Sequence, residues 1–189
     1  SLLSAILALA GCASKDEITN STAAPDVASG AVVSSEAIVE SPDDNYRTWY
    51  EIFVYSFCDS DGDGIGDLNG VTSKLDYLEE LGINGIWLMP IHPSSSYHKY
   101  NVTDYYAIDP QYGTMEDFEA FLAEAHRLGL RVVIDCVANH TSPDAVWTTQ
   151  RAPEWYERDS SGKTTFTADW SDTANLNYEN KDVWQGMAD

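Results

Sequence analysis

Four carboxylates lie within the nine residues from Asp59 to Asp67, and glycines separate several of them. Charges this close repel one another unless a cation lies among them. A hard divalent ion takes several oxygen ligands, which alternate side chains and one carbonyl can supply. The spacing predicts a metal site made of Asp59, Asp61, Asp63, the Ile65 carbonyl and Asp67. The alternative is a solvated acidic turn. An EF-hand does not fit, because the twelfth position is Gly70 and a predicted strand precedes the loop.

A second group of polar and aromatic residues occupies Tyr97–Tyr106, directly after a short apolar run. It combines several tyrosines with His98 and Asp104. Such a set can stack on a sugar ring and hydrogen-bond its hydroxyls. A loop held down by its own tyrosines explains the same pattern equally well.

A third group is Asp135-Cys136-Val137-Ala138-Asn139-His140-Thr141. Asp135 falls inside an apolar predicted strand, where an unpaired carboxylate is costly, so it must meet an arginine, a donor network or a ligand. His140 follows at the end of this strand, at the rim where a ligand would bind. Together at a strand end, Asp135 and His140 favour a binding site over two separate structural roles.

Alternating strands and helices position these groups. Three apolar segments read as strands, at residues 51–57, 86–90 and 132–135. The first helix has apolar residues at helical spacing and a glycine stop, namely Val71, Leu75, Leu78, Leu81 and Gly82. The second starts at a Thr114 cap, ends at Gly129 and buries the face made of Phe118, Phe121, Leu122, Ala125 and Leu128.

This β-α-β-α-β order predicts an α/β fold with a parallel sheet covered by helices. A doubly wound sheet and a (β/α)₈ TIM barrel both satisfy it. Polar, glycine-rich loops after the strands favour the barrel, and the missing phosphate-binding turn after the first strand disfavours a Rossmann domain. A closed barrel needs about 250 residues, whereas Tyr46–Asp189 supplies 144. We therefore expect the first three strands of an incomplete barrel.

Residues 1–12 resemble a partial lipoprotein signal peptide without an initiator Met or basic start. Leu9-Ala10-Gly11-Cys12 resembles a lipobox, which predicts lipidation of Cys12; the alternative is a plain secretory signal with an incidental Cys. Residues 13–45 have the composition of a disordered tether. Export would permit a disulfide between Cys58 and Cys136, but both are expected to be buried free thiols in strands.

The charge is strongly acidic, with 31 acidic and 10 basic side chains and a formal net charge of −21. A surface that follows phosphates needs clusters of Lys and Arg, which the sequence lacks. Nucleic acid and anionic membrane surfaces are therefore poor candidates for partners, and no protein partner is predicted.

In their order and spacing, the three groups resemble glycoside hydrolase family 13, the α-amylase family. The resemblance runs from about Tyr50 to Asp182, apart from a variable stretch after Thr141. Tyr50-Glu51-Ile52-Phe53-Val54 and the acidic loop are similar to the first strand and metal loop of the α-amylase and oligo-1,6-glucosidase branches. Asp135-x-x-x-Asn139-His140 is similar to the family's first conserved region.

The resemblance implies individual roles. Tyr100 would stack on the sugar on the non-reducing side of the cleaved bond, with His98 beside it, and His140 would bind that sugar's 6-hydroxyl. Asp135 would hold an arginine beyond the end of this chain. Asn139 would be a ligand of a calcium site between barrel and inserted domain. A second ion, calcium or magnesium, would bind Asp59, Asp61, Asp63, Ile65 and Asp67.

Some positions depart from the family. Lys99 stands where amylases commonly have Gly, and Asn101 where the oligo-1,6-glucosidase branch has Asp. Ala174-Asn175-Leu176-Asn177 replaces Pro-Asp-Leu-Asn, so Asn175 removes a carboxylate that can bind calcium. The resemblance divides the folded part into barrel units at 46–141, a short domain B at 142–176 and the start of the third barrel helix at 177–189, capped by Asn180.

The resemblance further implies an α-amylase-type enzyme that hydrolyses α-1,4-glucosidic bonds in starch-like glucans with retention. Retaining glycosidases use two carboxyl groups, which in this family follow the fourth and fifth strands. No catalytic residue is therefore assigned in this chain, and the 189-residue chain alone is expected to be inactive. The alternatives are a transglycosylating or α-1,6-cleaving member, and a non-catalytic glucan-binding lipoprotein. The lipid at Cys12 implies an exported protein anchored to a bacterial membrane.

Overall fold

The computed structural model describes residues 47–188. The predicted signal peptide, the Cys12 lipidation site and the tether lie outside the described residues. Within residues 47–188, no helix is long and apolar enough to cross a membrane.

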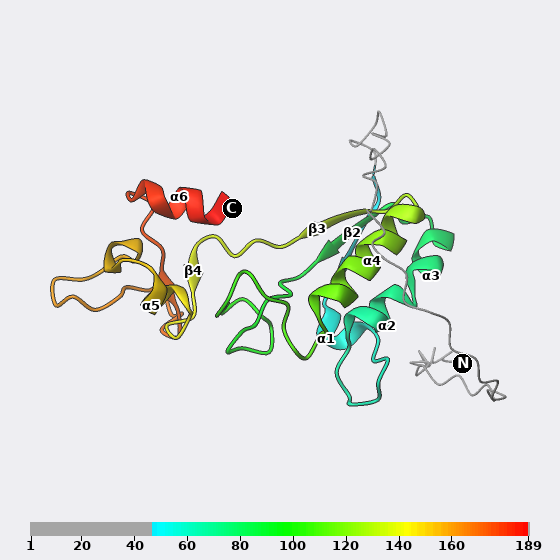
Figure 1. Ribbon diagram of the computed structural model, residues 1–189, viewed down its shortest axis with the longest axis horizontal. Helices are drawn as coiled ribbons and strands as arrows, with labels where there is room; N and C mark the ends of the chain where they lie inside the picture. The colour runs from blue at the N-terminus through cyan, green and yellow to red at the C-terminus, as the bar shows by residue number, and fades with distance from the viewer. Residues whose placement is uncertain (1–46, 189) are drawn as a thin grey trace, which may run out of the picture. The chain divides into compact units, whose positions relative to one another are not determined.

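Three parallel strands lie side by side in the order of the chain (Figure 1). They are β1 (Trp49–Ile52), β2 (Gly85–Leu88) and β3 (Arg131–Ile134). Their register aligns Ile52 with Leu88 and Leu88 with Ile134, so the three strands end level with one another. The loops that carry the three polar groups therefore leave the same edge of the sheet, as the barrel interpretation predicts.

The first predicted strand, 51–57, is partly wrong. β1 ends at Ile52, and Val54–Phe57 forms a short helix, α1. Parallel pairing ends where the Met89 N–H donates to the Ile52 carbonyl. Val54 then turns into the core, where it is 1% exposed. A β-rich composition cannot mark where strand partners end.

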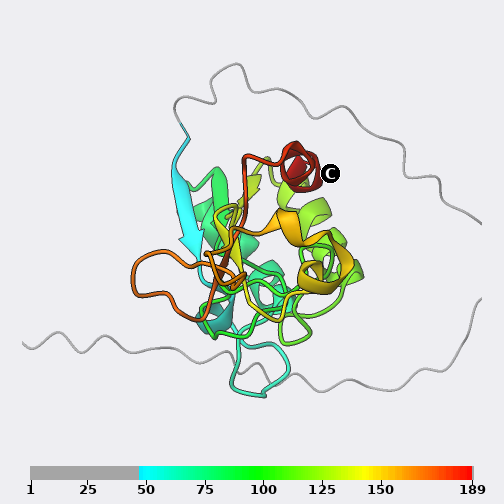
Figure 2. The same ribbon diagram turned by 90° about the vertical axis from the view of Figure 1, so that its left-hand side faces the viewer.

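Helices cover one face of the sheet (Figures 1 and 2). The first predicted helix is two short ones, α2 (Leu68–Thr72) and α3 (Leu75–Glu80), and Leu81 is 56% exposed rather than on the inner face. The second is α4 (Met115–Arg127), confirmed with its Thr114 cap. Both predicted glycine stops have left-handed backbones, with φ of 85° at Gly82 and 73° at Gly129.

The main core lies between the helices and one face of the sheet, with Ile52, Ile86 and Leu88 fully buried against Leu68, Leu78 and Phe121. The opposite face carries Glu51, Trp87 and Val133, aligned across the strands. Trp87 and Val133 are each 42% exposed. The prediction of a fully buried third strand is therefore wrong for Val133, because alternate strand residues point to opposite faces and the helices cover only one.

A second, smaller core follows β3. Strands β4 (His140–Thr141) and β5 (Ala174–Asn175) pair antiparallel. Helix α5 (Trp147–Gln150), the short 3₁₀ helix η2 (Pro153–Trp155) and helix α6 (Lys181–Ala188) complete this part. Its buried residues are Trp147, Trp155, Tyr156, Ala174, Leu176 and Val183. The Asn180 side chain accepts a hydrogen bond from the Asp182 N–H at 3.0 Å, which confirms the predicted start of α6.

Cys58 and Cys136 do not form a disulfide with each other. Cys58 is buried at 6% exposed, as predicted, whereas Cys136 is exposed. The prediction fails for Cys136 because β3 ends at Ile134 and the chain then leaves the sheet.

Candidate functional site

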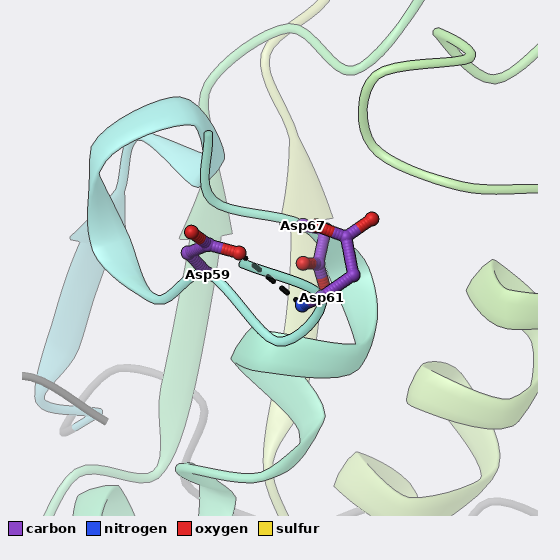
Figure 3. Close-up of side chains that lie close together, drawn as sticks. All are labelled: Asp59, Asp61 and Asp67. Atoms are coloured by element: carbon purple, nitrogen blue, oxygen red, sulfur yellow. Dashed lines mark hydrogen bonds between the residues drawn. The ribbon is translucent and has the colours of Figure 1, made fainter. Parts of the chain in front are cut away.

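The acidic loop brings three of its carboxylates together. Oxygens of Asp59, Asp61 and Asp67 all lie within 4.8 Å of one another (Figure 3). Asp67 is 8% exposed and caps α2 by accepting a 2.7 Å hydrogen bond from the Gly70 N–H. It also accepts bonds from the Ser60 N–H and hydroxyl, each at 2.8 Å, which closes the loop.

Asp59 faces the other side of the loop. Its oxygens accept hydrogen bonds from the Gly62 N–H at 2.7 Å and the Gly64 N–H at 2.8 Å. These bonds lower the pKa of the Asp59 carboxyl, because they favour its charged form. Asp59 is therefore a carboxylate at neutral pH.

The structure does not bring Asp63 into this group. Its carboxylate instead accepts a 2.7 Å bond from the Ile65 N–H. The donor set of Asp59, Asp61 and Asp67 still fits a hard divalent cation, since all its side-chain ligands are carboxylate oxygens. Neither salt bridge between residues of the described part involves the loop.

The second and third polar groups meet directly. The Tyr100 hydroxyl donates a 2.5 Å hydrogen bond to the Asp135 carboxylate. Asp135 thus has a donor partner, as an aspartate next to an apolar strand requires. Burial, and then the bond to Asp135, raise the pKa of Tyr100 to about 12. The ring is therefore neutral across the range in which proteins are normally assayed.

Both predicted histidines lie beside Tyr100. The Tyr100 N–H donates to His98 Nδ1 at 3.2 Å, and the two rings are 5.8 Å apart. His140 interacts with the Tyr100 backbone, and burial lowers the pKa of its imidazole, which favours the neutral ring. The four predicted site residues, His98, Tyr100, Asp135 and His140, are therefore neighbours, although they come from segments about 40 positions apart.

The acidic loop joins this group through α1. The Gly66 N–H donates to the Tyr55 carbonyl at 2.7 Å. The Tyr55 ring in turn lies 6.3 Å from the ring of Tyr97, edge to face. No described carboxylate of the loop reaches Tyr100 by a hydrogen bond.

Asn139 lies next to a separate hollow. Its amide is 3.0 Å from His140 Nδ1. It lines an open cavity of about 1160 Å³ together with Glu154, Glu157, Asn175 and Glu179. Asn175 donates to Glu157 at 3.2 Å. Asn139 and Asn175 thus lie together near carboxylates, but the Asn175 amide occupies one of those oxygens.

Sequence reasoning missed the partner of Lys99. Its side chain is 2% exposed, and its ammonium donates to Asp109 and to Gln111, each at 2.7 Å. Its φ of 68° is left-handed, a conformation that glycine adopts more readily than other residues. The departure from Gly noted at position 99 was the available signal in the sequence, but it does not identify Asp109 as the partner.

Two contacts reach across from the segment before β5. Asn101, 4% exposed, donates a 2.7 Å bond to the Asp172 carboxylate. The Trp170 ring lies 5.8 Å from that of His140. Neither Trp170 nor Asp172 was predicted, because their partners lie at least 30 positions away.

Comparisons with known proteins agree on one family. Residues 51–181 match the family model described as alpha amylase, catalytic domain. Alpha-amylase 3 of Dictyoglomus thermophilum is 42% identical over 157 residues, which cover 71% of this chain and 31% of that protein. Alpha-amylase SusG of Bacteroides thetaiotaomicron is 50% identical over 123 residues, 60% of this chain and 17% of that protein.

The solved structure of Amy13B from Eubacterium rectale superimposes with a TM-score of 0.70 at 42% identity. The match covers 77% of this chain and 34% of that one. The chain therefore spans about a third or less of the length of these relatives.

Proposed function

This chain belongs to the alpha-amylase family, and on that premise we propose that the complete protein hydrolyses α-1,4-glucosidic bonds in starch-like glucans with retention of configuration. The observation that carries the proposal is the hydrogen bond between Tyr100 and Asp135 beside His98 and His140. It links loops from two neighbouring strands at the edge where barrel enzymes bind their substrates.

In this proposal each residue has a limited task. The neutral Tyr100 ring offers its face to one glucose unit, and Asp135 holds its hydroxyl in place. His98 and His140 supply ring nitrogens for the sugar hydroxyls. A retaining mechanism also needs a nucleophile and a general acid, and we assign neither to a residue of this chain.

We propose that the acidic loop binds calcium, with magnesium as the alternative ion. Asp59, Asp61 and Asp67 would hold it, and the Ile65 carbonyl and Asp63 would complete the shell after a rotation of the Asp63 side chain. When bound, the ion supplies positive charge that offsets the crowded carboxylates. Asn139 is proposed as a ligand of a second calcium ion.

Titration calorimetry of the chelator-treated protein with Ca²⁺ and with Mg²⁺ tests the loop site. Asp59→Ala is expected to abolish the transition assigned to this site, whereas Asp159→Ala, in an exposed turn elsewhere, is the matched control. Equal binding by wild type and Asp59→Ala would refute the loop as the site.

Export and anchoring are proposed from the Cys12 motif. Mass spectrometry of the mature protein is expected to find a diacylated or triacylated Cys12 as the first residue, and Cys12→Ser to release the protein from the membrane fraction. An unmodified mature protein that starts elsewhere contradicts the proposal.

The activity is tested on the complete protein with amylose, pullulan and isomalto-oligosaccharides, with NMR to read the anomer first released. We expect cleavage of amylose to α-anomeric products. Tyr100→Ala should lower kcat/KM about fivefold or more, since an aromatic contact contributes about 1 kcal/mol beyond burial. Tyr77→Ala, on the exposed side of α3 at 54% exposure, is the matched control.

Other outcomes separate the alternatives. Preferential cleavage of isomalto-oligosaccharides, or transfer in place of hydrolysis, identifies the other members of the family. Amylose binding without product identifies a glucan-binding protein.

A further inference from the structure

We propose that Trp170 forms a second sugar-binding platform, which takes the glucosyl unit next to the one on Tyr100, and that the Asn101–Asp172 hydrogen bond holds it in position. This inference rests on the proposed function, because it extends the same glucan site. Neither Trp170 nor the pair was expected from the sequence.

Trp170 is an exposed aromatic ring at the edge of the site. It is 52% exposed, although a tryptophan gains more than most residues from burial. Its ring is tilted by 55° against the His140 ring, with centroids 5.8 Å apart. A sugar that hydrogen-bonds His140 therefore has the Trp170 ring as an immediate neighbour.

The backbone of Trp170 is held on both sides. Its N–H donates to the Thr167 carbonyl at 3.1 Å, and its carbonyl accepts bonds from the Thr173 N–H at 3.1 Å and hydroxyl at 2.7 Å. Thr173 is 4% exposed and directly precedes β5. The ring is thus presented from an ordered turn, which limits the entropy lost when a ligand binds.

The Asn101–Asp172 bond connects this turn to the Tyr100 loop. It joins residues 71 positions apart, with the Asn101 amide as donor and the Asp172 carboxylate as acceptor at 2.7 Å. The Asn101 amide can donate to Asp172, whereas an ionised carboxylate at position 101 could not. An aspartate at position 101 would place two carboxylates in contact, and like charges at this distance repel.

The hydrogen bond to Asp172 therefore gives Asn101 a role that an aspartate at this position could not fill. In this protein, position 101 sets the distance between the Tyr100 ring and the Trp170 ring. A neutral glucosyl chain, which carries apolar ring faces and many hydroxyls, is the ligand class that fits two aromatic rings beside two histidines.

The first test measures the ring itself in the complete protein, by calorimetric binding of maltoheptaose and of glucose, which fills one site only. Trp170→Ala is expected to weaken maltoheptaose binding about tenfold and glucose binding at the Tyr100 site by less than twofold. Trp170→Tyr should recover most of the affinity. Trp184→Ala, an exposed tryptophan on α6 at 61% exposure, is the control.

The second test measures the pair. Asn101→Asp is expected to weaken maltoheptaose binding as much as Trp170→Ala does, and Asn101→Asp combined with Asp172→Asn to restore it, because one donor and one carboxylate again face each other. Destabilisation unrelated to this hydrogen bond would not recover in this way.

The outcomes distinguish the proposals. If the protein binds no glucan, the proposed function fails. If it binds glucan and Trp170→Ala lowers the affinity for both ligands equally, or for neither, the platform is refuted. If the combined variant binds no better than Asn101→Asp alone, the positioning role of the pair is refuted.

Discussion

Replacing Lys99 by methionine tests the buried ion pair in the loop that carries Tyr100. The side chains of Lys99 and Asp109 are 2% and 6% exposed, and the Lys99 ammonium also lies 5.0 Å from the centre of the Tyr112 ring. Methionine fills the volume but leaves the Asp109 carboxylate buried without its cation. Breaking a buried pair from one side costs about 3–5 kcal/mol.

The left-handed backbone at Lys99 decides how glycine compares with methionine. A non-glycine residue in this conformation costs about 1–2 kcal/mol, so Lys99→Gly relieves that strain while it loses the same ion pair. The net loss for Lys99→Gly is then about 1–4 kcal/mol. The free energy lost with the ion pair is larger than the strain energy relieved by glycine. We therefore expect wild type to be the most stable, Lys99→Gly to be intermediate and Lys99→Met to be the least stable.

Urea unfolding of the complete protein, followed by tryptophan fluorescence, measures the order. Lys99→Met combined with Asp109→Leu removes both charges, and such replacements are often neutral, so it should be more stable than Lys99→Met alone. A loss below about 1 kcal/mol for Lys99→Met, or no recovery in the double variant, refutes the reasoning.

Three further predictions concern single hydrogen bonds. Asp67→Ala should cost about 1–2 kcal/mol from the lost cap in urea unfolding, whereas Asp67→Asn should keep most of that stability and lose metal affinity in calorimetry; equal stability of the two variants contradicts the cap. Tyr100 should titrate near pH 12 in ¹³C NMR of labelled tyrosine, and Asp135→Asn should lower its pKa towards 10. Because the folded-state pKa is raised, the stabilising contribution of neutral Tyr100 is present below pH 10 and is lost as the pH rises to 12; an unchanged Tyr100 pKa in Asp135→Asn argues against the bond. Thr114→Ala should cost about 1 kcal/mol of unfolding free energy and Thr114→Ser almost none, and a loss as large in Thr114→Ser would exclude the capping box.

Interactions between residues close together in the sequence determined several features of this protein. The Thr114 cap, the Gly129 stop and the buried face of α4 follow from interactions within a few residues, and all three were predicted. The order of strands and helices, with polar residues after each strand, also predicted that Tyr100 and His140 would lie at one edge. These features depend on short-range hydrogen bonds and on periodicity, which a single sequence displays.

The tertiary structure decided what depends on partners far along the chain. β1 ends at Ile52, where its pairing with β2 ends, and the composition of residues 51–57 does not indicate that point. The Asp63 carboxylate lies outside the group of Asp59, Asp61 and Asp67 although its spacing equals that of Asp61, and both Asp61 and Asp63 accept a hydrogen bond from the N–H two residues on. The partners of Lys99 and Asn101 were invisible for a different reason: a buried charge or amide needs a complementary group in space, and the fold alone determines which distant residue supplies it.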